Sequence, residues 1–259
     1  MIKRMMFLAA IMVCAAAVLA HAKKEWDELK GSNFIVYSRD VPEDFVNTVL
    51  EEAENDFRRV SENLGVVHYQ SWAWDKRANI YIYPNEEDYV KNGGMGWSHG
   101  SALVQAKMIR TFPSDNGFFD SILPHELGHI ILHEYVGPVA DVPLWFDEGV
   151  AMYQEKARRL GAHAAVRKAI KNGQFIPLTQ LAVMRLYNGT DKETVQLFYA
   201  ESASVVNFMI AELGEAHFRK LCQGLKDRMR FEQALSAAYM RIDHLEELNK
   251  RWVAFLEGE

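Results

Sequence analysis

Two histidines and a glutamate in the segment Leu123–His129 form the pattern H-E-x-x-H. On an α-helix, side chains four positions apart lie about 40° apart around the axis, so both imidazoles can reach one metal ion. Glu126 follows the first histidine directly and projects beside the ion, where a carboxylate can accept a proton from bound water. The pattern therefore predicts a helix that carries two metal ligands, His125 and His129, and a general base, Glu126.

A catalytic metal usually has three protein ligands and one open position, so a third donor is expected. Asp141, Asp147 and Glu148 follow the histidines and compete for this role. Asp141 falls in an expected loop, and Asp147 points away from the metal if Glu148 points toward it, although Asp147 can then orient a ligand histidine. His133 continues the histidine face, but it lies about 12 Å along the helix axis from His125, too far to share one ion. We expect His133 to be structural or to support the metal ligands from behind.

The spacing and the flanking residues resemble those of the gluzincin metallopeptidases. Eighteen residues separate His129 from Glu148, and the stretch L-W-F-D-E-G-V-A beginning at Leu144 is similar to the L-W-L-N-E-G-F-A stretch of aminopeptidase N relatives. From Phe119 onward the chain resembles the bacterial peptidase MA-like domains still more closely. These domains have a helical tail with a Tyr-Ala-x-Ser motif, which Tyr199–Ser202 fits. The metzincin class is excluded, since Leu132 and Tyr135 stand where it has glycine and histidine.

The resemblance implies a zincin-like metallopeptidase whose substrate is a peptide or protein. By it, His125, His129 and Glu148 carry over as ligands of Zn²⁺ and Glu126 as the base. A metal of this kind polarises the scissile carbonyl and lowers the pKa of bound water, and a further donor should stabilise the oxyanion. Tyr199, in the tail motif, is the candidate donor. The alternative is that its ring only packs in the helical core.

One departure from the aminopeptidases bears on specificity. Those enzymes hold the substrate's free amine with a Gly-x-Met-Glu-Asn strand, and the corresponding edge strand, expected near Gly100–Leu103, does not match it. An endopeptidase is therefore more consistent than an aminopeptidase. A hydrolase of another amide would need the same ligands. An inactive metalloprotease-fold module that binds a protein in the cell envelope is a further alternative, which the presence of Glu126 disfavours.

The elements that must position these residues follow from hydrophobic periodicity. We expect a first lobe, residues 23–156, with strands and helices alternating, and a helical second lobe, residues 157–259. The expected strands are Phe34–Tyr37, Ala78–Tyr83 and Ser101–Thr111, and the first expected helix is Asp44–Leu64. Asp120 or Ser121 should cap the metal-binding helix, with Pro124 in its first turn. The expected later helices are Phe198–Leu213, Glu215–Leu225, Phe231–Met240 and Asp243–Leu256. A small mixed sheet followed by helices is an α+β fold.

The first 22 residues have the form of a secretory signal peptide: Lys3 and Arg4, an apolar run to Ala20, and the A-x-A ending at Ala22. Export to the periplasm or the exterior is therefore expected, without stable membrane insertion after cleavage. An uncleaved anchor and lipidation at Cys14 are the alternatives. The mature chain would keep one cysteine, Cys222, which the helical pattern predicts to be buried.

The net charge of the chain limits the classes of partner that it can bind. Without Lys3 and Arg4, 27 basic and 35 acidic residues remain, a net charge of about −8. No basic tract offsets this charge, which argues against nucleic acid as a partner. The sequence carries no signal for an oligomeric state. Of the other polar residues, His99 is expected at the surface, and Glu155 is expected to be a solvated or salt-bridged acid on the helix that carries Glu148.

Overall fold

The computed structural model describes residues 26–258, except 67–71, 73–75, 95, 97–98, 115–116 and 188. The expected signal peptide, Met1–Ala22, lies outside the described residues. Among the residues that are described, no helix combines the length and the apolar character that crossing a bilayer requires.

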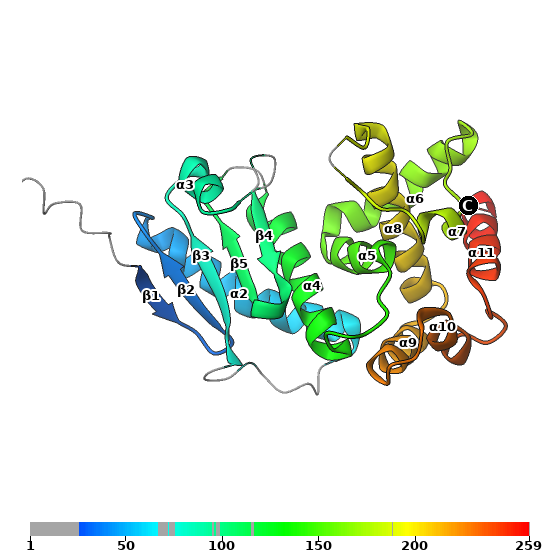
Figure 1. Cartoon of the computed structure of the whole chain (residues 1–259), viewed down its shortest axis with the longest axis horizontal. Helices are drawn as coiled ribbons and strands as arrows, with labels where there is room; N and C mark the ends of the chain where they lie inside the picture. Colours follow the sequence, from blue (N-terminus) through cyan, green and yellow to red (C-terminus); the bar gives the residue numbers. More distant parts are fainter. Residues whose placement is uncertain are drawn as a thin grey trace, which may run out of the picture.

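A five-stranded mixed sheet forms one side of the molecule (Figure 1). Its strands are β1 (Asp27–Lys30), β2 (Phe34–Ser38), β3 (Ala78–Ile82), β4 (Gly100–Leu103) and β5 (Met108–Thr111), in the order β1-β2-β3-β5-β4. The three central strands are parallel, and both edge strands run antiparallel to their neighbours. Every second residue of β2 and β3 is buried, as a strand with one face on the core requires.

The single strand expected over Ser101–Thr111 is wrong, because the chain reverses within it. β4 and β5 form a hairpin joined by a 3₁₀ turn, Val104–Ala106, and Lys107 adopts a left-handed backbone with φ 45°. The Lys107 ammonium is held by Glu134, on the helix that carries His125 and His129, at 3.1 Å. This reversal makes β4 the edge strand of the sheet, as expected for Gly100–Leu103.

The helices cover the sheet and then form a lobe of their own. α2 (Glu43–Leu64) packs against β2 and ends at Gly65, which is left-handed with φ 71°. α3 (Glu86–Lys91) is short. The others are α4 (Leu123–Val136), α5 (Leu144–Gln154), α6 (Lys156–Lys171), α7 (Leu178–Leu181), α8 (Lys192–Ala211), α9 (Glu215–Lys226), α10 (Phe231–Ala238) and α11 (Leu245–Gly258). In Figure 1, α4 lies beside the sheet and α5 begins the helical lobe. The α+β architecture is confirmed.

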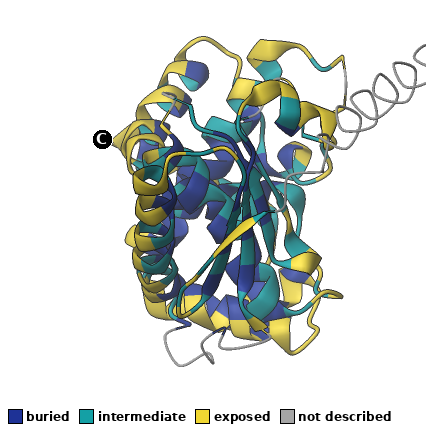
Figure 2. Ribbon diagram, turned by 90° about the vertical axis from the view of Figure 1, so that its left-hand side faces the viewer, coloured by how far each residue is buried: buried dark blue, intermediate teal, exposed yellow. Residues whose placement is uncertain are grey.

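One hydrophobic core runs through both lobes. It extends from Phe34 and Ile80 of the sheet, through Leu127 and Trp145, to Trp252 of the last helix. Figure 2 shows buried residues where the sheet and helices face one another and exposed residues on the outer helix faces. Cys222 belongs to this core and is buried, as predicted.

Two glycines set how closely the central helices approach. A Cβ on Gly128 of α4 would lie 2.8 Å from the Cα of Ala151 on α5, and a Cβ on Gly149 of α5 would lie 2.4 Å from the carbonyl oxygen of Ser202 on α8. Only a residue without a side chain fits at either position. Gly128 directly precedes His129, and Gly149 directly follows Glu148. These two close helix contacts therefore lie beside His129 and Glu148.

Candidate metal centre

The helix that carries His125 and His129, α4, does not begin as expected. A π-helical turn, Phe118–Ile122, leads directly into α4, and the N–H of Leu123 is bonded to the carbonyl of Phe118. Because Ile122 already has helical angles, neither Asp120 nor Ser121 caps α4, and that prediction is wrong. Pro124 lies in the first turn, as expected. The Ser121 hydroxyl donates a hydrogen bond to Glu155 instead.

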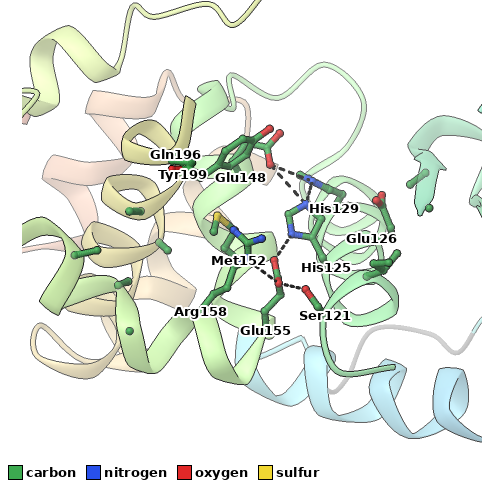
Figure 3. A pocket seen from close by; sticks show the side chains of 18 of the residues that line it. Ser121, His125, Glu126, His129, Glu148, Met152, Glu155, Arg158, Gln196 and Tyr199 are labelled. Carbon is green, nitrogen blue, oxygen red and sulfur yellow. Dashed lines mark hydrogen bonds and ion pairs between the residues drawn. The ribbon is translucent and has the colours of Figure 1, made fainter. Parts of the chain in front are cut away.

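His125, His129 and Glu148 lie together and could hold a metal ion, since one donor atom from each falls within 4.8 Å of the others. The two Nε2 atoms are 3.2 Å apart, and Oε2 of Glu148 lies 3.6 Å from His125 Nε2 and 3.7 Å from His129 Nε2. Figure 3 shows the three side chains converging from α4 and α5. Of the competing carboxylates, Asp141 lies elsewhere and accepts a hydrogen bond from the N–H of Phe231.

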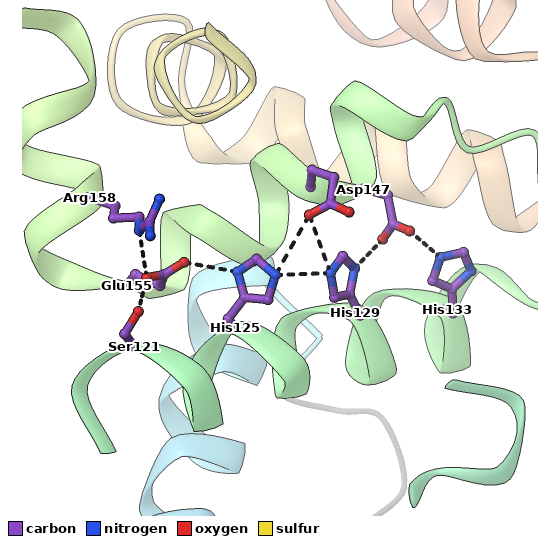
Figure 4. A network of polar contacts seen from close by, with 8 residues as sticks. Ser121, His125, His129, His133, Asp147, Glu155 and Arg158 are labelled. Atoms are coloured by element: carbon purple, nitrogen blue, oxygen red, sulfur yellow. Dashed lines mark hydrogen bonds and ion pairs between the residues drawn. The ribbon is translucent and has the colours of Figure 1, made fainter. Parts of the chain in front are cut away.

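Asp147 holds the second histidine from behind. Its Oδ1 lies 2.8 Å from His129 Nδ1, and its Oδ2 lies 3.0 Å from His133 Nε2 (Figure 4). When Nε2 of His129 faces an ion, its Nδ1 carries the hydrogen and donates it to Asp147. The orienting role considered for Asp147 and the structural position expected for His133 agree with this arrangement.

Glu155 holds the first histidine in the same way, which the sequence did not predict. Its Oε1 lies 2.9 Å from His125 Nδ1, and its Oε2 accepts a hydrogen bond from Ser121 and forms an ion pair with Arg158, whose Nε lies 3.1 Å away. Glu155 is only 4% exposed, so of the two expectations for this residue the solvated acid is wrong and the salt-bridged acid is confirmed by its ion pair with Arg158. The physical reason is that α5 ends at Gln154, and the extended backbone of Glu155 (φ −80°, ψ 105°) turns its carboxylate back toward α4.

Burial and charge act against each other at these groups. Burial lowers the pKa of His129, but the hydrogen bond to Asp147 and the nearby carboxylates raise it overall, to about 9. Burial raises the pKa of Asp147, yet hydrogen bonds from His129 and His133 bring it well below its usual range. Burial keeps the pKa of Glu148 raised in spite of both ligand histidines. The carboxylates around His129 therefore favour positive charge at this position, as a cation site requires.

The three candidate ligands line one wall of a pocket of about 750 Å³. Glu126 and Tyr199 line it as well, and in Figure 3 Glu126 lies across the two histidines from Tyr199. The Tyr199 ring packs against a small buried cluster, Met152, Ala162 and Ala203, and burial together with the charge of Glu148 raises the pKa of Tyr199 to about 12. Tyr199 thus both packs and faces the pocket.

Opposite the helices, the pocket is bounded by Gly100, Ser101 and Ala102 of β4. His99 lies just outside it, half-buried, with its ring 5.7 Å from that of Phe112. Ser121, Glu155 and Arg158 are among the pocket residues to which the sequence analysis assigned no role at the site. The segment Gln154-Glu155-Lys156 contains no glycine or proline, so the break between α5 and α6 leaves no sequence signal.

Comparison with known proteins agrees with this geometry. A search of curated proteins finds no significant match. A family model described as the peptidase MA superfamily matches residues 66–258, a range that includes β3–β5, both ligand-bearing helices and the helical lobe. The match covers most of the chain and is consistent with the zincin-like fold expected from the sequence. The chain belongs to the peptidase MA superfamily.

Proposed function

We propose that this protein is an exported zinc metallopeptidase, with His125, His129 and Glu148 as the ligands. The observation that carries the proposal is the triangle of donor atoms. Around a tetrahedral zinc with bonds of about 2.0–2.1 Å, neighbouring ligand atoms lie roughly 3.4 Å apart. The observed edges of 3.2, 3.6 and 3.7 Å fit that requirement. A set of two imidazoles and one carboxylate is also typical of a catalytic zinc with an open position.

The chain's own residues supply the remaining parts of a hydrolase. When bound, zinc would polarise a carbonyl and lower the pKa of coordinated water. Glu126 is the group that takes the water's proton and delivers it to the leaving amine. Tyr199 stays protonated at neutral pH, because its pKa is about 12, and can donate its hydroxyl to the developing oxyanion. Asp147 and Glu155 fix the two imidazole rings.

An endopeptidase fits the pocket better than an aminopeptidase. β4 pairs only with β5 among the described strands, so its outer edge can receive an extended peptide by backbone hydrogen bonds. The pocket residues from β4 are Gly100, Ser101 and Ala102, and none of these three has a carboxylate to bind a free amine. The pocket's glutamates are assigned elsewhere: Glu148 to the metal, Glu155 to His125 and Glu126 to the proton transfer.

The test is Glu126→Gln in the mature chain, compared with wild type. We expect both proteins to retain one zinc per chain by elemental analysis, and only wild type to cleave unfolded casein. Glu212→Gln, at an exposed position, is the matched control and should behave as wild type. Wild-type protein that binds no zinc would refute the proposal. Zinc binding without hydrolysis of any peptide or amide would favour the inactive binding module instead.

Export has its own test. Expressed with its full sequence in a bacterium, the protein should be recovered from the periplasm or medium, with a new N-terminus at Lys23. Recovery from the membrane fraction with Met1 intact would favour the uncleaved anchor.

A further inference from the structure

Arg158 is the only lysine or arginine among the described residues that line the metal pocket. It lies in the first turn of α6, and its side chain is 58% exposed. The catalytic roles proposed above do not use it. A cation at this place needs an explanation, because every other charged group in the pocket is a glutamate or a candidate metal-binding histidine.

The guanidinium of Arg158 is held in position through its Nε atom. Its Nε forms an ion pair with Glu155 at 3.1 Å, while Glu155 is itself fixed by Ser121 and His125. Among the described residues, the ion pair of Arg158 is made through Nε, and the two terminal nitrogens, which carry four of the five N–H donors, are not part of it. An arginine anchored in this way presents a planar donor pair, the geometry that matches a carboxylate.

An apolar surface adjoins this cation. Met152, Ala162 and Ala203 form a buried cluster that lines the same pocket, with the Tyr199 ring packed against it. Beside it, Gly161 has open space where a Cβ would project. A side chain with a short aliphatic part and a terminal anion would place its methylenes on this cluster and its charge at Arg158.

The distance to the metal ligands fits a residue close to the cleaved bond. Arg158 Nε, the Glu155 carboxylate and the His125 ring form a continuous chain of contacts of 3.1 Å and 2.9 Å. Allowing for the widths of the carboxylate and the ring, the guanidinium lies within roughly 10 Å of His125 Nε2, about three residues of extended chain.

We propose that Arg158 is a specificity-determining residue that binds a carboxylate of the substrate within three residues of the scissile bond. This inference rests on the proposed peptidase function. The carboxylate can come from an aspartate or glutamate side chain or from the C-terminus of the peptide. Both sources present the same chemistry to the guanidinium.

The experiment uses the zinc-loaded mature enzyme and a family of quenched fluorescent peptides around one cleaved sequence. One arm places Glu or Gln at each of three positions on either side of the bond. The other arm compares a free C-terminus with its amide. We expect wild type to prefer the carboxylate by about tenfold in kcat/KM in one arm, chiefly through KM, and the arm that responds identifies the source.

Arg158→Gln should reduce that preference to about one, and Arg158→Glu should favour a lysine at the same position. Lys156→Gln, exposed in the same turn and outside the pocket, should keep the wild-type preference. If Arg158 acted only by holding Glu155, its loss would change kcat for charged and neutral peptides equally, which would overturn the specificity role. Arg158→Lys, which keeps the charge but not the planar donor pair, should retain part of the preference, and it tests the proposal if Arg158→Glu does not fold.

The two proposals fail in different ways. Equal cleavage of every matched pair by wild type would overturn the role of Arg158 and leave the peptidase intact. Absence of cleavage of all the peptides by zinc-loaded wild type would overturn both.

Discussion

Glu201 should make the stability of this protein fall as the pH rises through neutrality. It lies on α8, directly after the pocket residue Ala200, and is fully buried. One carboxylate oxygen accepts a hydrogen bond from the N–H of Ile176 at 2.9 Å, and the other has no partner among the described residues. Burial raises the pKa of Glu201 from 4.5 to about 8. The folded protein therefore holds a proton that the unfolded chain has released.

The difference between the folded and unfolded pKa of Glu201 sets the sign and size of the change in unfolding free energy with pH. A carboxyl with a raised folded pKa contributes its full stability below pH 4.5, and that stability is lost as the pH rises toward 8. Each pH unit in this window is worth about 1.4 kcal/mol, so raising the pH from 5 to 7 costs about 3 kcal/mol. In a chain of this length, that cost corresponds to a decrease in Tm of roughly 8 °C.

Glu201→Gln removes the titration while keeping an oxygen for the N–H of Ile176. The free energy of unfolding should be measured by urea titration at fixed zinc and several pH values from 5 to 8. Because other titrating groups affect both proteins equally, the informative quantity is the difference between variant and wild type. Between pH 5 and 7, we expect the free energy of unfolding of wild type to fall by about 3 kcal/mol relative to that of the variant. A difference that does not change with pH would refute the reasoning, and Glu212→Gln, at an exposed position, provides that flat reference.

Three further substitutions test the centre. Glu155→Gln weakens the acceptor behind His125 and should reduce zinc affinity about 10–100-fold, measured by competition with a chelator; unchanged affinity would contradict the orienting role. Tyr199→Phe should lower kcat by roughly 10²–10³-fold with zinc retained, and equal turnover would leave Tyr199 only its packing role. Gly149→Ala places a methyl group 2.4 Å from the carbonyl oxygen of Ser202. This substitution should lower the free energy of unfolding by about 1–3 kcal/mol and weaken metal binding. A Tm equal to that of wild type would show that α5 and α8 can separate freely.

The pattern of success and failure in the sequence predictions has local causes. His125, His129 and Glu148 could be assigned because helical periodicity and motif spacing are properties of short segments. The hairpin between β4 and β5 was missed because its left-handed residue is Lys107, where the sequence pattern favours glycine or asparagine. α6 was not predicted as a separate helix. Its buried face has only Ala162, Val166 and Ala169, so its apolar period is weak.

Glu155 and Arg158 were beyond prediction for a different reason. Their roles depend on a break in the helix that Glu155 itself occupies, and on the π-helical turn that carries Ser121 to the same carboxylate. Both are consequences of how α4, α5 and α6 pack. Propensity over a window of residues contains no information about such packing.

The close packing at Gly128 and Gly149 links folding to metal supply. The candidate ligands come from two helices that meet only when α4, α5 and α8 are in contact, so an unfolded chain has no preformed site. A metal that binds only the folded form adds to the free energy of unfolding by mass action, about 4 kcal/mol at a free concentration a thousand times Kd. If the site binds zinc as proposed, the stability of this protein should depend on the zinc available where it folds, and a chain that folds without zinc should be unfolded and degraded more often.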